Sequence, residues 1–148
     1  MAGKNVKDVM TKNPECVTEK ETLRAVAKMM ADNDCGAIPV VDSTSTRKPV
    51  GMITDRDIVI RAIAKGKDPA TTTVADAMSK GVKTVKDDDS IDKVFKVMSD
   101  AKVRRVPVVD SKGGVVGIVA VADVAETNQD RKLADAVEEI SERGKGSK

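Results

Sequence analysis

The sequence has no histidine, no tryptophan and no tyrosine, and its one aromatic residue is Phe95. Without histidine, HExxH metal sites and Ser-His-Asp triads are excluded, and the commonest general base is missing. The scarcity of aromatic rings argues against single-strand nucleic-acid binding, in which bases stack on such rings. It also requires an aliphatic core.

Cysteine is scarce as well. The two cysteines, Cys16 and Cys35, are too few and too far apart for a CxxC zinc site, and we predict no metal site. Such cysteines are typical of small core residues and suit a reducing, cytoplasmic setting. The 26 basic and 24 acidic residues leave a net charge of +2, which is too small an excess to indicate a nucleic-acid partner.

Long apolar runs are also missing. The longest apolar block, Val115 to Ala122, is far short of the roughly 20 residues that a membrane span needs. The first ten residues lack the apolar run of a signal peptide. We therefore expect a cytoplasmic protein without a membrane segment. Its 148 residues suffice for one domain or for two small units that share a core.

The sequence is internally duplicated. Residues 6–42 and 74–110 align at an offset of 68 (74 − 6), and 13 of the 37 aligned positions are identical. Further along, the offset becomes 66 (117 − 51), and it pairs Gly51 with Gly117 and Asp57 with Asp123. Self-similarity of this kind indicates a repeated structural unit. We place repeat 1 at residues 6–64, a linker at 65–73, repeat 2 at 74–126 and a C-terminal tail at 127–148.

Each repeat reads as β-α-β-β-α, which predicts an α+β (α/β-type) fold with small sheets flanked by helices. Leu23, Val26 and Met30 have helical spacing, and Thr18-x-x-Glu21 is a candidate capping box for that helix. The runs IPVVD and VPVVD suit buried strands, each followed by a second strand and a helix. About 60 residues make a marginal core, so the copies should pack together. The tail, with Leu133, Ala136, Val137 and Ile140 at helical spacing, suits a short docking helix.

The DVM opening, the (I/V)PVVD strand and the GMITDRD motif, arranged in a twofold repeat, resemble the cystathionine-β-synthase (CBS) domain family. Over residues 6–126 the chain resembles a tandem pair, or Bateman module. The resemblance implies a pseudo-twofold pair of repeats with two clefts. It also implies a non-catalytic regulatory function, in which an adenine nucleotide (AMP, ADP or ATP) or, less often, S-adenosylmethionine alters a partner protein. By the same resemblance we expect a homodimer.

The first repeat carries the complete ligand motif. The resemblance assigns Asp57 to the ribose hydroxyls and Thr54 to the ribose or phosphate. A carboxylate can accept both ribose hydroxyls in charge-assisted hydrogen bonds. The resemblance also implies that adenine lies against Cys16, Val17, Ile38 and Pro39. It implies that the phosphates contact Arg104 and Arg105 of the opposite repeat, and that Arg56 could add positive charge.

The second cleft is less well equipped. Asp123 is retained, but Ala120 replaces the threonine, and Gly36 and Ala37 stand where the arginines would be. We predict weaker binding there, or none. The remaining residues of this second site, by the same correspondence, are Thr84, Val85, Val106 and Pro107.

Plainer interpretations stay open. Thr54-x-x-Asp57 is also a helix-capping pattern, and the two roles can coexist. The arginine pair is also compatible with a solvated strand start. A ligand-free interaction or dimerisation module is the second functional hypothesis, and a nucleic-acid binder is the third. No nucleophile–base pair indicates an enzyme.

Overall fold

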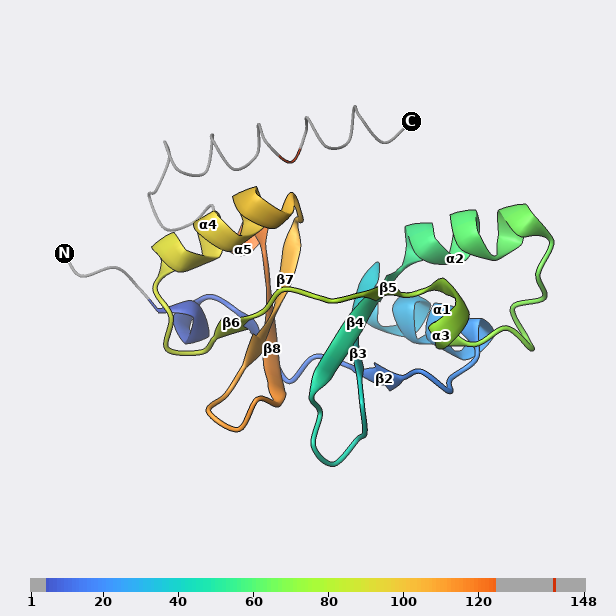
Figure 1. The fold of residues 1–148 in the computed structure, drawn as a ribbon, viewed down its shortest axis with the longest axis horizontal. Helices are drawn as coiled ribbons and strands as arrows, with labels where there is room; N and C mark the ends of the chain where they lie inside the picture. Colours follow the sequence, from blue (N-terminus) through green and yellow to red (C-terminus); the bar gives the residue numbers. More distant parts are fainter. Residues whose placement is uncertain (1–4, 125–139, 141–148) are drawn as a thin grey trace. The chain divides into compact units, whose positions relative to one another are not determined.

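The computed structural model describes residues 5–124 and residue 140. These residues form two compact units, drawn in Figure 1. The first-repeat unit contains residues 14–82 and 113–115. The second-repeat unit contains residues 5–13, 83–112 and 116–124, together with Ile140. Each unit has its own sheet and its own core.

The first-repeat unit is built on a mixed four-stranded sheet of order β2-β3-β4-β5. Strand β2 runs parallel to β3, whereas β3 and β4, and β4 and β5, are antiparallel. Its strands are β2 (Val17–Thr18), β3 (Ala37–Val41), β4 (Pro49–Thr54) and β5 (Ser79–Lys80). Its helices are α1 (Leu23–Asn33), α2 (Asp55–Arg61), the 3-10 helix η2 (Ile63–Lys65) and α3 (Val74–Ala77).

The second-repeat unit has the same plan, with the order β1-β8-β7-β6. Strand β1 is antiparallel to β8, and β6 is parallel to β7. Its strands are β1 (Thr11–Lys12), β6 (Val85–Lys86), β7 (Arg105–Val109) and β8 (Val115–Ala120). Its helices are η1 (Val6–Asp8), α4 (Ile91–Ala101) and α5 (Val121–Val124). The predicted α+β class with two small mixed sheets is confirmed.

The two long helices begin and end at corresponding positions. In α1 the Thr22 hydroxyl accepts the Ala25 N–H at 3.2 Å, and in α4 the Ser90 hydroxyl accepts the Lys93 N–H at 3.3 Å. Both helices end in a left-handed residue, at Asp34 (φ 50°) and Lys102 (φ 56°). The predicted Thr18-x-x-Glu21 capping box was therefore wrong. The turn continues to Thr22, whose side chain supplies the acceptor that the helix start needs.

The opening segment of each repeat lies in the sheet of the other repeat. Strand β5 pairs with β4, with Met52 opposite Ser79, and β1 pairs with β8, with Gly117 opposite Lys12. Figure 1 shows this exchange: the blue N-terminal segment lies beside the orange strands, and β5 lies beside β4. The compact units thus exchange the segments with which the sequence repeats begin.

Glycine permits this close pairing. A Cβ atom added to Gly51 would overlap the Ser79 carbonyl oxygen and the Met78 side chain. One added to Gly117 would overlap the side chain of Met10, the repeat counterpart of Met78. Gly51 begins the GMITDRD motif, and Gly117 begins its counterpart in the second repeat. Both glycines are therefore contact points for the exchanged segments.

The buried side chains form two aliphatic clusters, one in each unit. In β3 all five residues are buried, including Pro39. Strand β2 pairs only with Val40 and Val41, so the stretch of β3 at Pro39 borders one strand, where a missing N–H is tolerated. In the predicted tail helix, Leu133, Ala136 and Val137 lie outside the described residues, whereas Ile140 is 7% exposed and packs in the second-repeat core.

Among residues 5–124 and 140, the helices are too short and too polar to cross a bilayer.

Candidate functional site

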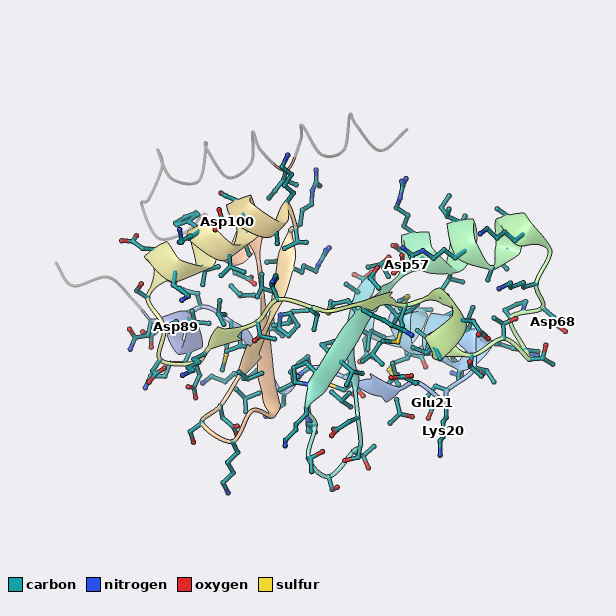
Figure 2. The ribbon with its side chains drawn as sticks, viewed as in Figure 1. Lys20, Glu21, Asp57, Asp68, Asp89 and Asp100 are labelled. Atoms are coloured by element: carbon teal, nitrogen blue, oxygen red, sulfur yellow. The ribbon has the colours of Figure 1, made fainter. Side chains whose placement is uncertain are left out.

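The Thr54–Asp57 motif lies where β4 runs directly into α2, as Figure 2 shows for Asp57. The Thr54 hydroxyl accepts the Asp57 N–H at 3.1 Å, and Asp57 Oδ2 accepts the Thr54 N–H at 3.0 Å. This reciprocal pair is a capping box, so the capping interpretation of the motif is correct. It fixes the orientation of both side chains before any ligand arrives.

Capping leaves part of the Asp57 carboxylate available. Its second oxygen, Oδ1, lies 3.9 Å from Arg61 Nε, a loose ion pair in which the Asp57 side chain is 13% exposed. A carboxylate offers about four acceptor positions, and the capping bond takes one of them. The Thr54 hydroxyl still has its own proton to donate. The pair can therefore cap α2 and accept a ribose hydroxyl at once.

The predicted adenine-contacting residues lie in the same unit. In the sheet, Ile38 pairs with Ile53 and Pro39 with Met52, close to the end of β4 at Thr54. The side chains of Val17 (3% exposed) and Ile38 (1% exposed) belong to the core cluster of this unit. They therefore offer a ligand mainly their backbone groups. Arg56 is exposed at the first turn of α2.

Cys16 is half-buried beside Arg47, a residue of the β3–β4 loop. Arg47 Nη2 lies 3.3 Å from Cys16 Sγ and donates to the Pro14 carbonyl at 2.9 Å. Burial raises the pKa of the Cys16 thiol, and the nearby Arg47 charge only partly opposes this rise. Cys16 is therefore a protonated thiol at neutral pH. Its role is to pack and to be positioned by Arg47, since a reactive cysteine needs a lowered pKa.

The predicted arginines belong to the second-repeat unit, together with the second copy of the motif. The Val121 N–H donates to the Arg104 carbonyl at 3.0 Å, and the Ala120 N–H donates to Asp123 Oδ2 at 2.8 Å. Arg104 and Arg105 are both exposed. Within this unit, Arg104 thus adjoins the start of the helix that carries Asp123.

The remaining residues of the predicted second site lie on β7 and at the start of β6. Val85, Val106 and Pro107 are buried, and Thr84 is half-buried. Ala120 leaves the second motif without the hydroxyl that Thr54 supplies. Asp123 nevertheless keeps its bond to the backbone, so half of the capping box persists without threonine.

A surface hollow of about 670 Å³ lies elsewhere in the first-repeat unit, lined by residues 18–20, 41–44, 73 and 75. In Figure 2, Lys20 is well separated from Asp57. The Asp42 carboxylate in this hollow accepts bonds from Thr46 Oγ1 at 2.7 Å and from the Ser43 N–H at 2.7 Å. The Thr46 bond above all lowers the pKa of Asp42, so the hollow carries a fixed negative charge. Glu19 and Lys20 also line the hollow with opposite charges, and none of the predicted site residues lines it.

Two arginines near the site were missed from the sequence. Arg61 stands four residues after Asp57, a spacing that brings side chains together on a helix and could have revealed it. Arg47 lies in a polar loop with no distinguishing signal, because its contacts with Pro14 and Cys16 connect residues far apart in the chain.

The profile of the CBS domain matches this chain twice, at residues 6–63 and 74–130. The chain belongs to the CBS-domain family. This confirms the tandem pair that the repeated motifs predicted.

Known CBS proteins resemble nearly the whole chain. Hypoxic response protein 1 of Mycobacterium tuberculosis is 38% identical over 134 residues, which cover 90% of this chain and 92% of that protein. The crystal structure of Hypoxic Response Protein I with two coordinated zinc ions has a TM-score of 0.75 and 39% identity, covering 83% of this chain and 98% of that one.

Another CBS protein of known structure contains adenosine-type ligands. The CBS domain pair of protein MJ0100, in complex with 5′-methylthioadenosine and S-adenosyl-L-methionine, has a TM-score of 0.74 and 31% identity. The match covers 87% of this chain and 98% of that one.

The crystal structure of Hypoxic Response Protein I contains zinc, so the metal-ligating side chains of this chain are of interest. The chain has no histidine, and the residues that the structure describes contain no group of three or more metal-ligating side chains.

Proposed function

We propose that this CBS pair is a non-catalytic regulatory module that binds an adenine nucleotide and signals its presence to a partner protein. The observation that carries the proposal is the Asp57 carboxylate, which its capping bond orients through Oδ2, while Oδ1 makes only a loose ion pair with Arg61 at 3.9 Å. Ribose presents two adjacent hydroxyl donors, which such a carboxylate can accept. We assign the ribose to Asp57 and Thr54.

The relative with bound 5′-methylthioadenosine and S-adenosyl-L-methionine supports an adenosine moiety as the shared chemistry. We assign adenine to the backbone around Cys16, Val17, Ile38 and Pro39. We also propose that the ligand carries phosphate and that Arg104 and Arg105 bind it, because guanidinium groups suit phosphate oxygens. S-adenosylmethionine, which has no phosphate, is the alternative ligand.

The second motif should bind more weakly. Asp123 makes the backbone bond that Asp57 makes, but Ala120 has no hydroxyl to add. We therefore propose one principal ligand per chain, with Asp57 as its anchor.

A thermal-shift panel of AMP, ADP, ATP and S-adenosylmethionine tests the proposal. A ligand at 100 times its dissociation constant adds roughly 2.7 kcal/mol of stability. In a chain of this size that raises Tm by roughly 5–10 °C. We expect Asp57→Asn to abolish the shift and Asp123→Asn to leave most of it.

Asp42→Asn is the matched control, because it changes a carboxylate in the hollow. If this variant lost the shift while Asp57→Asn kept it, the ligand would bind in the hollow and the assignment to Asp57 would be wrong. No shift with any of the four compounds would favour the ligand-free interaction module. A shift with S-adenosylmethionine alone would remove the phosphate assignment.

We further propose that the module forms a homodimer through α2. Val59 (53% exposed), Ile60 (48%) and Ile63 (51%) form an apolar stripe on this helix and η2. Their counterparts in the second repeat, at an offset of 66, are Ala125, Glu126 and Gln129. The stripe is therefore specific to the first repeat, and a second copy could cover it with its own.

The composition of the chain supports a proposed setting and a proposed class of partner. Two free cysteines suit the reducing cytosol, where we place the protein. A net charge of +2 with one aromatic residue argues against nucleic acid as the partner. We therefore propose that the partner that responds to nucleotide binding is a protein.

A further inference from the structure

Arg61, the last residue of α2, contacts two different parts of the first-repeat unit. Its Nη1 donates to the Ala77 carbonyl at 3.1 Å and to the Met78 carbonyl at 2.9 Å. Its Nε lies 3.9 Å from Asp57 Oδ1. One guanidinium therefore lies between the carboxylate of the site and two carbonyls at the C-terminal end of α3, those of its last residue Ala77 and of the C-cap Met78, where a cation is favourable.

The contact between Asp57 and Arg61 does not use the oxygen that caps α2. Asp57 Oδ2 already accepts the Thr54 N–H, and Oδ1 is the oxygen on the Arg61 side. A ribose hydroxyl that reaches Asp57 would therefore bind next to Arg61. By displacing water it would strengthen the attraction between Asp57 and Arg61, because an ion pair is stronger in a lower dielectric.

The carbonyls that Arg61 holds belong to the segment that leaves the unit. Residues 79–80 form β5 and pair with β4, and residues 81–82 are the last before the chain enters the second-repeat unit at Lys83. Strand β4 itself ends at Thr54. The ligand motif and the exit segment are thus joined twice, through the β4–β5 pairing and through Arg61.

The sequence of the second repeat has no arginine at the position that corresponds to Arg61. At an offset of 66, Thr127 stands in place of Arg61, although Asp123 keeps its bond to the Ala120 N–H. Arg61 thus occurs in the first repeat, whose motif also has the Thr54 hydroxyl. A helix cap alone would not need it, because the second copy keeps its carboxylate bond without it.

We propose that Arg61 is a positioning residue that transmits occupancy of Asp57 to residues 77–82. The inference rests on the proposed nucleotide site. When ribose covers Asp57, Arg61 is immobilised against the carboxylate, and its bonds to the Ala77 and Met78 carbonyls become more persistent. The segment that connects the two units is then more ordered in the bound state.

Hydrogen exchange of the full chain, followed by mass spectrometry with and without AMP and, in parallel, ATP, tests the inference. In the wild type we expect nucleotide to slow exchange in peptides covering residues 77–82. Arg61→Met keeps the aliphatic chain and removes the donors. It should still bind nucleotide, more weakly because the attraction between Arg61 and Asp57 is lost, but at saturating nucleotide it should show no slowing at 77–82. Lys65→Met, an exposed basic residue one turn further on, should behave as wild type.

Arg61→Lys is the second variant, because it keeps the charge and the fold should tolerate it. A single ammonium cannot reproduce the fork that reaches both carbonyls and the carboxylate, so we expect the slowing to be reduced. If Arg61→Met and Arg61→Lys both bind nucleotide and keep the full slowing, the inference is wrong and the proposed function stands. If neither nucleotide binds the wild type, the proposed function fails and the inference fails with it.

Discussion

Met10 lies against Gly117, and this contact joins the opening segment of the first repeat to a strand of the second. The counterpart contact, Met78 against Gly51, joins the opening segment of the second repeat to a strand of the first. The two contacts differ in what surrounds the glycine. A Cβ atom added to Gly51 would lie nearest to a backbone carbonyl oxygen, that of Ser79. One added to Gly117 would lie nearest to the Met10 side chain.

Gly51→Ala should therefore destabilise the protein more than Gly117→Ala. A backbone carbonyl cannot move without disturbing the β4–β5 pairing, so we expect a loss of about 3 kcal/mol at Gly51 and about 1 kcal/mol at Gly117. Urea unfolding of the two variants measures this. Adding Met10→Ala should relieve part of the Gly117→Ala loss, whereas adding Met78→Ala should relieve little at Gly51, where the Ser79 carbonyl remains. Equal losses at the two glycines would contradict this account of the exchanged segments.

Thr54→Ala should lower stability by about 1 kcal/mol, because it removes the acceptor of the Asp57 N–H at the start of α2. Thr54→Ser keeps an oxygen in the same place and should retain most of the stability. The reciprocal change, Ala120→Thr, should raise stability by offering the Asp123 N–H the side-chain hydroxyl acceptor that alanine does not supply. Thermal unfolding of the three variants without ligand measures capping separately from binding. An unchanged Tm in Thr54→Ala would show that the box contributes nothing to the fold.

Ile60→Glu on the apolar stripe of α2 should convert a dimer to a monomer. The isoleucine is 48% exposed in the single chain, so a charge there costs the fold little but opposes burial in an interface. Analytical ultracentrifugation gives the oligomeric state, and Lys65→Glu, outside the stripe, is the control. A wild type that sediments as a monomer, or an Ile60→Glu variant that stays dimeric, would show that a second copy does not cover the stripe.

Asp42 should make stability depend on pH. Hydrogen bonds, led by that from Thr46, lower its pKa in the folded protein. A carboxyl whose folded pKa lies below its unfolded pKa contributes stability above the unfolded value and loses it as pH falls through the folded value. Asp42→Ala should thus have a lower Tm than wild type at neutral pH, and the gap should close in acid. A gap that stays constant between neutral and acidic pH would mean that ionisation of Asp42 has no part in it.

Cys35 should react with a thiol reagent before Cys16. Cys35 is exposed, whereas Cys16 is half-buried and burial raises its pKa, which lowers its thiolate fraction. Timed labelling followed by peptide mass spectrometry distinguishes the two sites, and Cys35→Ser should leave only the slow phase. Faster modification of Cys16 would show that the Arg47 charge outweighs burial.

Much of the fold was predictable because its signals are local or self-similar. The repeat offset, the helical spacing of Leu23, Val26 and Met30, and the valine runs after Pro39 and Pro107 each lie within a short stretch of sequence. The same holds for the Thr54–Asp57 pair, whose capping geometry follows from a spacing of three residues. The exact cap of α1 was missed because Thr18 and Thr22 offer the same chemistry, and only the path of the chain selects Thr22.

By itself, the sequence determined the duplication, the order of elements, the family and the polar motif that begins α2. Only the tertiary structure decided which sheet each opening segment joins and that Arg61 and Arg47 reach distant backbone carbonyls. The reason is physical. Strands β1 and β5 are two residues each, TK and SK, and such short strands carry no pattern that prefers one sheet over the other. Their partners are selected by long-range packing of Met10 and Met78 against the glycines, which no local spacing encodes.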